Sequence, residues 1–385
     1  MQLSDCHNFQ DFRRLARRRL PGPIFNYIDG AADDEATLRQ NTASFEQCDL
    51  VPNILRGVAT IDMAVTVMGQ KLAMPVYCSP TALQRLFHHQ GERAVAAAAS
   101  KFGTMFGVSS LGTVGLEELR KKYDTPQAYQ FYFHKDRALN RAMAQRAKEA
   151  GVNVMMLTVD TITGGNRERD LRTGFSIPLK LSMSGMLQFA IRPAWALNYM
   201  THEKFSLPQL DEHVDMSGGA MSIGRYFSEM LDQTMNWDDV AEMVEAWDGQ
   251  FCLKGVMSVA DAKRAVDIGC TGIILSNHGG RQLDGSRAAF DQLAEIVDAV
   301  GDRIDVIMDG GVRRGTHVLK ALSLGAKAVG VGRYYLFPLA AAGQAGVERA
   351  LGLMRTEIER DMKLMGCSSV SQLSCANLRF RRGPG

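Results

Sequence analysis

The sequence predicts an α/β fold, a TIM (β/α)8 barrel with an N-terminal helical segment and a long insertion after the fourth strand. Short apolar runs alternate with helical patterns along most of the 385 residues, which is typical of βαβ units in a parallel sheet. Polar or glycine-rich residues follow each apolar run, at the strand ends where barrel enzymes build their sites. The absence of a GxGxxG motif after the first strand argues against a doubly wound sheet.

Strands are expected where the apolar runs are short, and helices where apolar residues recur with helical spacing. The eight predicted strands are 73–78, 104–109, 126–132, 152–158, 250–254, 272–276, 304–309 and 326–331. The predicted helices between them include 91–102, 136–150, 258–268, 288–300 and 314–324.

The whole chain, 1–385, is expected to form a single domain. The stretch FNYIDGAADDEATL (25–38) predicts a helix, a turn and a second helix ahead of the barrel. The expected parts are an N-terminal segment (1–70), the barrel (71–160 and 236–340), the insertion (161–235) and C-terminal helices with a tail (341–385).

Two segments bear on membrane contact. The insertion contains the apolar and aromatic stretch MLQFAIRPAWALNYM (186–200), which predicts a lid, an oligomer contact or a segment that dips into a membrane surface. Near the start, RRLARRRL (13–20) carries five arginines, which indicates a solvated helix face or attraction to an anionic membrane.

The composition limits the classes of function. Hydrophobic residues make up 46% and charged residues 22%, and a net charge of +2 gives no reason to expect nucleic-acid binding. The seven cysteines are scattered and never form a CxxC pair, so neither disulfides nor a metal site is predicted. Neither a signal peptide nor a membrane span is predicted. The chain is therefore expected to be cytoplasmic, with a peripheral position on the inner face of the membrane as the alternative.

Two loops rich in glycine and arginine follow the seventh and eighth strands, at MDGGVRRGTH (308–317) and GVGRYY (330–335). Backbone N–H groups near glycines and at helix N-termini bind anions, and barrels commonly bind phosphate at these two loops. Because neither loop has the Walker pattern, the ligand is expected to be held by its phosphate and used at its other end. The candidate phosphate residues are Gly311, Arg313, Gly332 and Arg333.

The stretch SNHGGRQLDG (276–285) follows the sixth strand and suggests acid–base chemistry. Asp160, at the end of the fourth strand, is a candidate to hydrogen-bond the His278 imidazole and poise it as a base. The planar fork of Arg281 suits a carboxylate. Two further candidates for a carboxylate clamp are Arg167 and Tyr27. A base beside such a clamp predicts proton abstraction from a 2-hydroxy or 2-amino acid.

This stretch also resembles, without a departure, the active-site signature of the FMN-dependent 2-hydroxy acid dehydrogenases and oxidases. The resemblance extends from about Leu20 to Leu373. Further motifs occur in family order: SPTALQRL, QFYFHKDR, LTVDT, LKGV, DGGVRRG and GVGR. The resemblance implies a TIM barrel that carries FMN, usually as a homotetramer.

The resemblance also implies a role for each matched residue. His278 would be the catalytic base, Asp160 its partner and Tyr132 a contact to the substrate hydroxyl. The substrate carboxylate would be bound by Arg281, Arg167 and Tyr27. The implied FMN contacts are Pro80, Thr81 and Ala82 near flavin N5, Ser109, Gln130 and Thr158 at the ring edge, Lys254 at N1 and O2 with Ser276 nearby, Asp309 at the ribityl chain, and Gly311, Arg313, Gly332 and Arg333 at the phosphate.

Departures from the family pattern bear on the substrate. Leu111 stands where glycolate oxidase has tryptophan, and residues 161–166 lack the usual proline, which together suggest a roomier or reshaped pocket. GNRERDL resembles the mandelate dehydrogenases, whereas the insertion and AGQAGV (342–347) resemble bacterial L-lactate dehydrogenases.

The leading hypothesis from the sequence is oxidation of L-lactate to pyruvate, with electrons passed to a respiratory quinone or cytochrome. A mandelate-type dehydrogenase and a soluble oxidase that produces hydrogen peroxide are the alternatives. A phosphate-binding isomerase or a non-catalytic ligand-binding barrel would leave His278, Arg281, Lys254 and Asp160 without a function.

Overall fold

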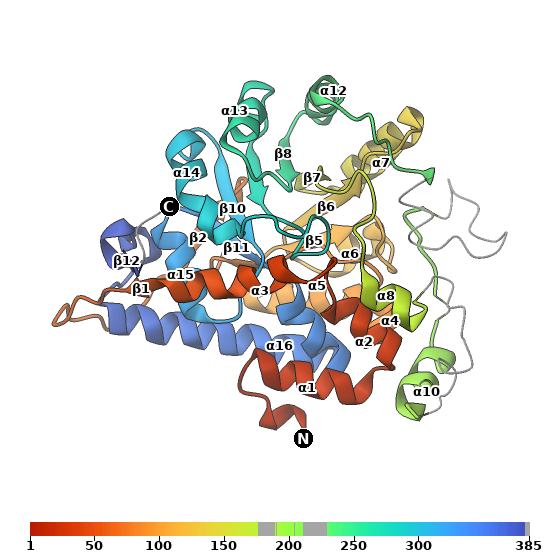
Figure 1. Ribbon diagram of the computed structural model, residues 1–385, viewed down its shortest axis with the longest axis horizontal. Coiled ribbons are helices and arrows are strands. Elements are labelled where there is room, and N and C mark those ends of the chain that lie inside the picture. The colour runs from red at the N-terminus through yellow and green to blue at the C-terminus, as the bar shows by residue number, and fades with distance from the viewer. Residues whose placement is uncertain (176–188, 190, 204, 211–228, 382–385) are drawn as a thin grey trace.

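The computed structural model describes residues 1–175, 189, 191–203, 205–210 and 229–381 (Figure 1). Eight parallel strands close into a barrel in chain order, and the last strand pairs with the first. They are β4 (Val76–Cys78), β5 (Phe106–Ser109), β6 (Gln127–Tyr132), β7 (Val154–Thr158), β8 (Gln250–Lys254), β9 (Gly272–Leu275), β10 (Asp305–Asp309) and β11 (Ala328–Val331). The predicted TIM barrel is confirmed, and each strand lies inside its predicted range.

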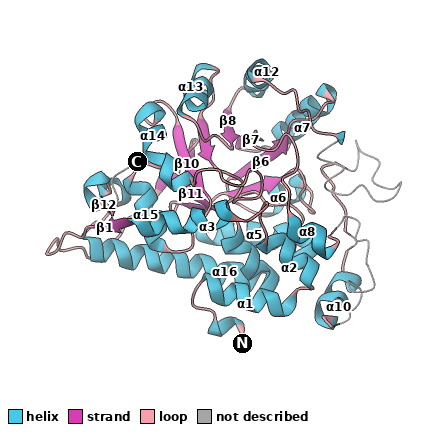
Figure 2. Ribbon diagram, in the orientation of Figure 1, coloured by secondary structure: helices cyan, strands magenta, loops and turns pink. Residues whose placement is uncertain are grey.

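Helices surround the strands on the outside of the barrel (Figure 2). They are α4 (Gln84–Phe87), α5 (Gly91–Phe102), α6 (Leu116–Lys122), α7 (Arg137–Glu149), α12 (Trp237–Trp247), α13 (Val259–Asp267), α14 (Ala289–Val300) and α15 (Gly315–Ser323). Side-chain caps begin several of them, such as Asp136, which accepts hydrogen bonds from the first backbone N–H groups of α7.

The N-terminal end of the barrel is plugged by a short hairpin that the sequence did not predict, β2 (Val65–Val67) and β3 (Gln70–Leu72). The Met68 side chain lies against Gly272, and its N–H donates to the Asp305 carboxylate at 2.5 Å. Because Gly272 and Asp305 begin β9 and β10, the hairpin covers the end where those strands start. The opposite, C-terminal ends are therefore the ones left to form a site.

The N-terminal segment packs across the lower part of the molecule in Figure 1. It consists of η1 (Leu3–Asp5), α1 (Phe9–Arg19), α2 (Gly22–Asp29), α3 (Ala36–Ala43) and η2 (Ser44–Gln47). Helix α1 buries an apolar stripe that includes Phe12 and Leu15, and it packs on the long helix α16 (Arg333–Met365). Burial of each large apolar side chain stabilises the fold by about 1.5–3 kcal/mol.

The two ends of the chain are joined by an antiparallel pair, β1 (Cys48–Leu50) with β12 (Leu378–Phe380). Two short helices, η3 (Val370–Gln372) and η4 (Cys375–Asn377), precede β12. Helix α16 runs from the end of the barrel toward this pair, with non-helical backbone at Ala342 and Gly343.

Within the insertion the structure describes α8 (Glu168–Thr173) and α10 (Pro193–Thr201). Part of the apolar stretch at 186–200, including Met186, lies outside the described residues. No helix in the described part of the chain combines the length and apolar character needed to cross a bilayer.

Candidate active site

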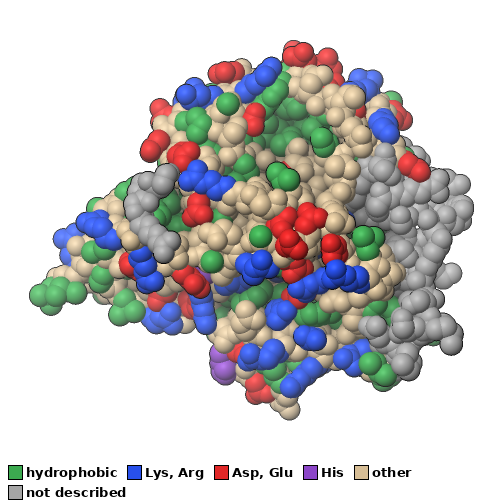
Figure 3. Space-filling view, in the orientation of Figure 1, with side chains coloured by type: hydrophobic (Ala, Val, Ile, Leu, Met, Phe, Trp, Pro, Cys, Tyr) green, Lys and Arg blue, Asp and Glu red, His purple; other side chains and the backbone are tan. Residues whose placement is uncertain are grey.

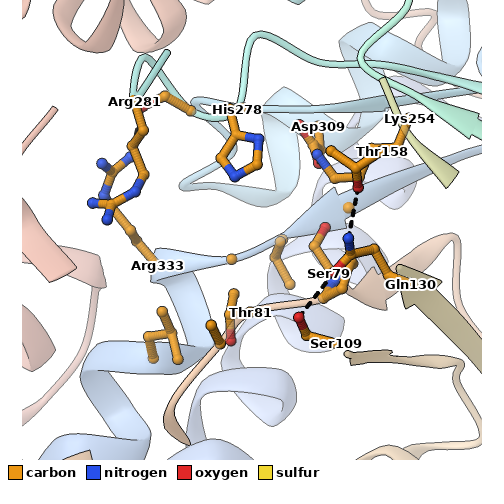
Figure 4. Close-up of a pocket in the computed structure, with 18 of the residues that line it drawn as sticks. Ser79, Thr81, Ser109, Gln130, Thr158, Lys254, His278, Arg281, Asp309 and Arg333 are labelled. Carbon is orange, nitrogen blue, oxygen red and sulfur yellow. Dashed lines mark hydrogen bonds and ion pairs between the residues drawn. The ribbon is translucent and has the colours of Figure 1, made fainter. Parts of the chain in front are cut away.

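A cavity opens at the C-terminal ends of the strands. All predicted site residues line it except Asp160 and Ser276. These two contact lining residues: Asp160 accepts a hydrogen bond from His278, and Ser276 Oγ accepts one from Lys254 Nζ at 2.8 Å. Residues far apart in the sequence are thus gathered around one space (Figure 4).

The candidate base comes from the loop after β9, and its partner comes from the loop after β7. The His278 Nδ1 atom lies 2.9 Å from Asp160 Oδ1. If Nδ1–H donates to the carboxylate, Nε2 is left to accept a proton. Burial alone would raise the Asp160 pKa, but His278, Lys254 and a hydroxyl from Thr161 lower it below its ordinary value. The carboxylate is therefore held in its charged form beside the imidazole.

The loop after β9 needs unusual backbone conformations to present this histidine. His278 itself has a φ of 57°, and Gly280 has a φ of 77°. A Cβ at Gly280 would lie 2.7 Å from the backbone nitrogen of Leu38, so the loop packs directly on the N-terminal segment.

The candidate carboxylate clamp is built from the N-terminal segment and two loops. Arg281 donates from Nη1 to the Tyr27 carbonyl at 2.6 Å, and its guanidinium lies 4.8 Å from the centre of the Tyr27 ring. Arg167 lies 5.8 Å from the centre of the same ring. Burial and the neighbouring Arg167 lower the pKa of the Arg281 guanidinium. Two cations beside one aromatic ring suit a substrate carboxylate.

A chain of side-chain hydrogen bonds crosses three neighbouring strands on one wall of the cavity (Figure 4). Ser109 Oγ donates to Gln130 Oε1 at 2.9 Å, and Gln130 Nε2 donates to Thr158 Oγ1 at 2.8 Å. The Thr81 hydroxyl is held by Tyr335 at 2.7 Å and by Gln84 at 3.0 Å. The polar edge of a planar ring would meet donors and acceptors along this wall.

A buried ion pair stands next to that wall. Lys254 Nζ lies 3.0 Å from the Asp309 carboxylate. Burial alone would lower the Lys254 pKa, but Asp309 and Asp160 outweigh that effect and raise it, so a fixed positive charge faces the cavity.

The loops after β10 and β11 hold two further cations. Arg333 donates to the carbonyl oxygens of Ile28, Gly279 and Gly30. Arg313 lies 3.8 Å from the centre of the Phe9 ring. Within the described ranges neither forms an ion pair, and burial lowers the pKa of both guanidiniums. A guanidinium stays charged, so this arrangement is costly until an anion joins it.

Two glycines near these cations are in close contact with other segments of the chain. An added Cβ at Gly311, where φ is 77°, would overlap the Asn41 carbonyl oxygen. One at Gly330 would overlap the Ser79 hydroxyl and meet the Tyr77 ring at 2.9 Å. The absent side chains therefore let Gly311 pack against the N-terminal segment and Gly330 against Ser79 and Tyr77 of the neighbouring strand region, and both glycines also line the cavity. The cations, the glycine-rich loops that line the cavity and the polar wall together fit FMN.

Several lining residues were not predicted from the sequence: Ser79, Phe87, Gln282 and Leu336. Ser79 directly follows β4, so the strand-end argument applied to its neighbours would also have found it. Gln282 stands next to Arg281 but has no charge to mark it. Phe87 and Leu336 are apolar residues on helices and carry no signal of a site in one sequence.

The chain is similar to known proteins over nearly its whole length. The sequence model of the family described as FMN-dependent dehydrogenase matches residues 16–380. Glycolate oxidase 1 of Oryza sativa subsp. indica is 38% identical over 376 residues, which is 98% of this chain and 96% of that protein. L-lactate oxidase of Nostoc sp. is 38% identical over 382 residues, which is 98% of this chain and 99% of that protein.

A solved structure is similar as well. The crystal structure described as that of monotopic membrane protein (S)-mandelate dehydrogenase superposes with a TM-score of 0.92 and 32% sequence identity. The match covers 98% of this chain and 100% of the other. A family match of this length, a closed barrel and a cavity that fits FMN lead to one conclusion. This chain belongs to the FMN-dependent dehydrogenase family and is an FMN-dependent oxidoreductase of 2-hydroxy acids.

Proposed function

We propose that this chain oxidises L-lactate to pyruvate and passes the electrons to a respiratory quinone or cytochrome. One observation carries the proposal: the loops after β7 and β9 bring His278, paired with Asp160, and the Arg281–Arg167 clamp together, and His278, Arg281 and Arg167 line a single cavity. The clamp binds the carboxylate and thereby holds the hydroxyl-bearing carbon toward the imidazole.

In this proposal each polar residue has a defined task. His278 Nε2 accepts the proton released as the alcohol becomes a carbonyl, and Asp160 stabilises the resulting imidazolium. Tyr132 contacts the substrate hydroxyl, and Tyr27 contributes to the clamp. FMN, when bound, supplies the acceptor for the two electrons that leave the substrate. It would be held by the residues of the polar wall, the Lys254–Asp309 pair and the two glycine–arginine loops.

The apolar part of the cavity supports an acid with an apolar side chain. Phe87, Leu111 and Tyr132 line the cavity and are almost fully buried. The methyl group of lactate suits these surfaces, and a relative at 38% identity bears the name L-lactate oxidase. A mandelate-type activity is the second candidate, because Leu111 leaves more room than tryptophan and a mandelate dehydrogenase superposes closely.

Anaerobic absorbance spectroscopy tests the reaction and separates the substrates. The FMN-loaded protein is mixed with L-lactate, L-mandelate or glycolate in parallel, and the loss of flavin absorbance is followed. The proposal expects the fastest loss with L-lactate. Loss of flavin absorbance with L-mandelate alone would assign the activity to aromatic acids. An unchanged spectrum with all three acids would overturn the proposal.

The acceptor is tested on the reduced protein. Samples reduced with the acid are mixed with oxygen or with a water-soluble quinone, and recovery of the oxidised spectrum is timed. The proposal expects recovery to be much faster with the quinone. Rapid recovery with oxygen, together with hydrogen peroxide, would instead establish an oxidase.

A peripheral position on the membrane forms part of the proposal. Arg192, just before α10, donates to the Leu20 carbonyl, so α10 adjoins the end of α1 that carries Arg17, Arg18 and Arg19. In Figure 3 basic side chains gather over α1. Next to them Leu197 is 64% exposed and Met200 79%. Cations beside exposed apolar side chains suit an anionic bilayer surface.

Sedimentation with phospholipid vesicles tests this part. Wild-type protein is expected to sediment with vesicles rich in anionic lipid, and Leu197→Gln with Met200→Gln is expected to remain in the supernatant. Leu364→Gln is the matched control, since Leu364 is 67% exposed on α16. Equal sedimentation of all three proteins would show that α10 makes no membrane contact.

A further inference from the structure

The hydroxyl of Thr161 lies against the His278–Asp160 pair. Thr161 follows Asp160 in the chain, is 4% exposed and lines the cavity. Its Oγ1 donates to Asp160 Oδ1 at 2.8 Å and lies 3.3 Å from His278 Nδ1. The three polar groups therefore form a triangle at the wall of the cavity.

We propose that Thr161 is a positioning residue for the catalytic base, acting through Asp160. The inference rests on the proposed role of His278. Thr161 is not expected to touch the substrate's reacting atoms, so its effect arises from the orientation of the carboxylate and of the imidazole.

The geometry explains how the Thr161 hydroxyl can orient the Asp160 carboxylate toward the His278 imidazole. Asp160 Oδ1 receives both the imidazole and the threonine hydroxyl, whereas Oδ2 has no hydrogen-bond partner within the described chain. A carboxylate held through one oxygen by a single donor can rotate about its Cβ–Cγ bond. The second donor, attached to the adjacent residue, restricts that rotation and keeps Oδ1 in line with Nδ1.

The same hydroxyl also bears on the imidazole. When its hydrogen points to Asp160, the lone pairs of Oγ1 face His278 Nδ1. Nδ1–H then meets two oxygen atoms, and both favour the tautomer in which Nε2 is free. The other charged group near Asp160 is Lys254, which acts on the carboxylate by its charge and not by a hydrogen bond to His278.

The backbone of this loop is fixed independently of the hydroxyl. Gln282 Nε2 donates to the carbonyls of Asp160 at 3.2 Å and Thr163 at 2.8 Å, and its Oε1 accepts from Gly165 N–H at 3.2 Å. Removal of the Thr161 hydroxyl should therefore leave the loop in place. This makes Thr161→Val, which keeps the shape of the side chain, an informative variant.

The test is anaerobic stopped-flow reduction of the FMN-loaded protein by the acid that reduces the wild type fastest. Thr161→Val should lower the limiting rate about tenfold or more, the size expected for one hydrogen bond to a charged group. The concentration of acid that gives half the limiting rate should change less than about twofold, since Arg281 and Arg167 are untouched. Thr161→Ser should recover most of the rate.

Two controls separate this role from a structural one. Thr163→Val changes the same residue type at an exposed position in the same loop and should leave the rate unchanged. In the Asp160→Asn background, Thr161→Val should cost much less than it does in the wild type, because the carboxylate that it acts through is already altered and only its contact with His278 remains. A full effect of Thr161→Val in that background would overturn the inference.

The proposed function is tested separately by His278→Ala. Loss of FMN reduction in His278→Ala with a wild-type rate in Thr161→Val would overturn only the inference. Retained reduction in His278→Ala would overturn the assignment of the base.

Discussion

The two halves of the cavity differ in how their charged groups are compensated. In the half around the ends of β7 to β9, the charged groups at the candidate base are paired: His278 with Asp160 at 2.9 Å, and Lys254 with Asp309 at 3.0 Å. Arg281 is the exception there, because it donates only to the Tyr27 and Gly30 carbonyls within the described residues. In the half around the loops after β10 and β11, Arg313 and Arg333 have carbonyl and aromatic neighbours but no carboxylate partner within the described residues.

This difference indicates which half of the cavity depends on bound FMN for its stability. The paired half keeps its geometry through contacts within the chain, so a substitution there should alter the reaction and leave FMN bound. The unpaired half carries an electrostatic cost that a phosphate relieves, so its stability should change with FMN. The predictions below test this division.

The largest effect is expected from His278→Ala. Without the proposed base, the limiting rate of FMN reduction should fall by about 10²- to 10⁴-fold, the usual contribution of a general base. FMN should remain bound at the wild-type ratio, because His278 lies outside the two loops that are proposed to hold the phosphate. Both quantities follow from one stopped-flow series and the absorbance ratio of the purified protein. Loss of FMN from this variant would contradict the division.

Gly311→Ala should instead reduce the binding of FMN. The new Cβ would overlap the Asn41 carbonyl oxygen, and the φ of 77° is itself strained for alanine. We expect loss of bound FMN and a fall of several kcal/mol in the free energy of unfolding, measured by denaturant titration.

Gly57→Ala is the matched control for Gly311→Ala. Gly57 has a similar φ of 64°, but nothing lies within 4 Å of its added Cβ. This variant should cost only the backbone strain of about 1 kcal/mol and should retain FMN. Equal losses in the two variants would show that strain, and not crowding at the loop, governs the result.

Removal of FMN should destabilise the protein, and an anion alone should reverse part of the loss. At a phosphate concentration of about 100 times its Kd, the apoprotein should gain about 2.7 kcal/mol. Thermal unfolding of the apoprotein with inorganic phosphate, and with chloride at equal ionic strength, measures this gain. Arg333→Met should abolish the response to phosphate. An equal response to both salts would show that the two arginines do not form an anion site.

The barrel could be predicted well because each of its strands is marked by a short apolar run in its own part of the sequence. The apolar runs that end at Ser109, Thr158 and Lys254 are visible without knowledge of their neighbours, and these polar ends lie together once the barrel closes. The β2–β3 hairpin and the β1–β12 pair escaped prediction, since three-residue strands carry little pattern.

Contacts between distant segments could not be predicted from one sequence. The glycine–arginine loops suggested a phosphate site, but nothing in their residues shows that Arg313 lies on Phe9 of α1. In the same way, His317 is expected from its surroundings in the sequence to have a surface or capping role. The structure gives it a bond of the capping kind, from the Arg313 N–H ahead of α15, and also stacks its ring on Phe45 at 4.3 Å, a contact that the sequence does not show.

The smallest expected effect concerns this histidine and the pH dependence of stability. Arg313 N–H donates to His317 Nδ1 at 3.3 Å, a bond that requires a neutral acceptor. Burial and the nearby Lys320 lower the His317 pKa from 6.5 to about 4. Between these two pH values the unfolded chain binds a proton that the folded chain excludes. Stability is therefore lost as the pH falls from 6.5 toward 4, by at most about 1.4 kcal/mol per pH unit from this residue.

His317→Gln isolates that contribution, because the amide oxygen can still accept the Arg313 N–H but does not titrate. Other buried histidines such as His134, whose pKa is also lowered to about 4 by burial, add to the wild-type slope, so the difference between the two proteins is the quantity to measure. Denaturant titrations at pH 7, 6 and 5 should give a shallower slope for His317→Gln, and His7→Gln, at an exposed position, should match the wild type. Identical slopes for all three proteins would mean that His317 gains a proton as readily in the folded chain as in the unfolded one, and the phosphate half would then lack this sensitivity to acid.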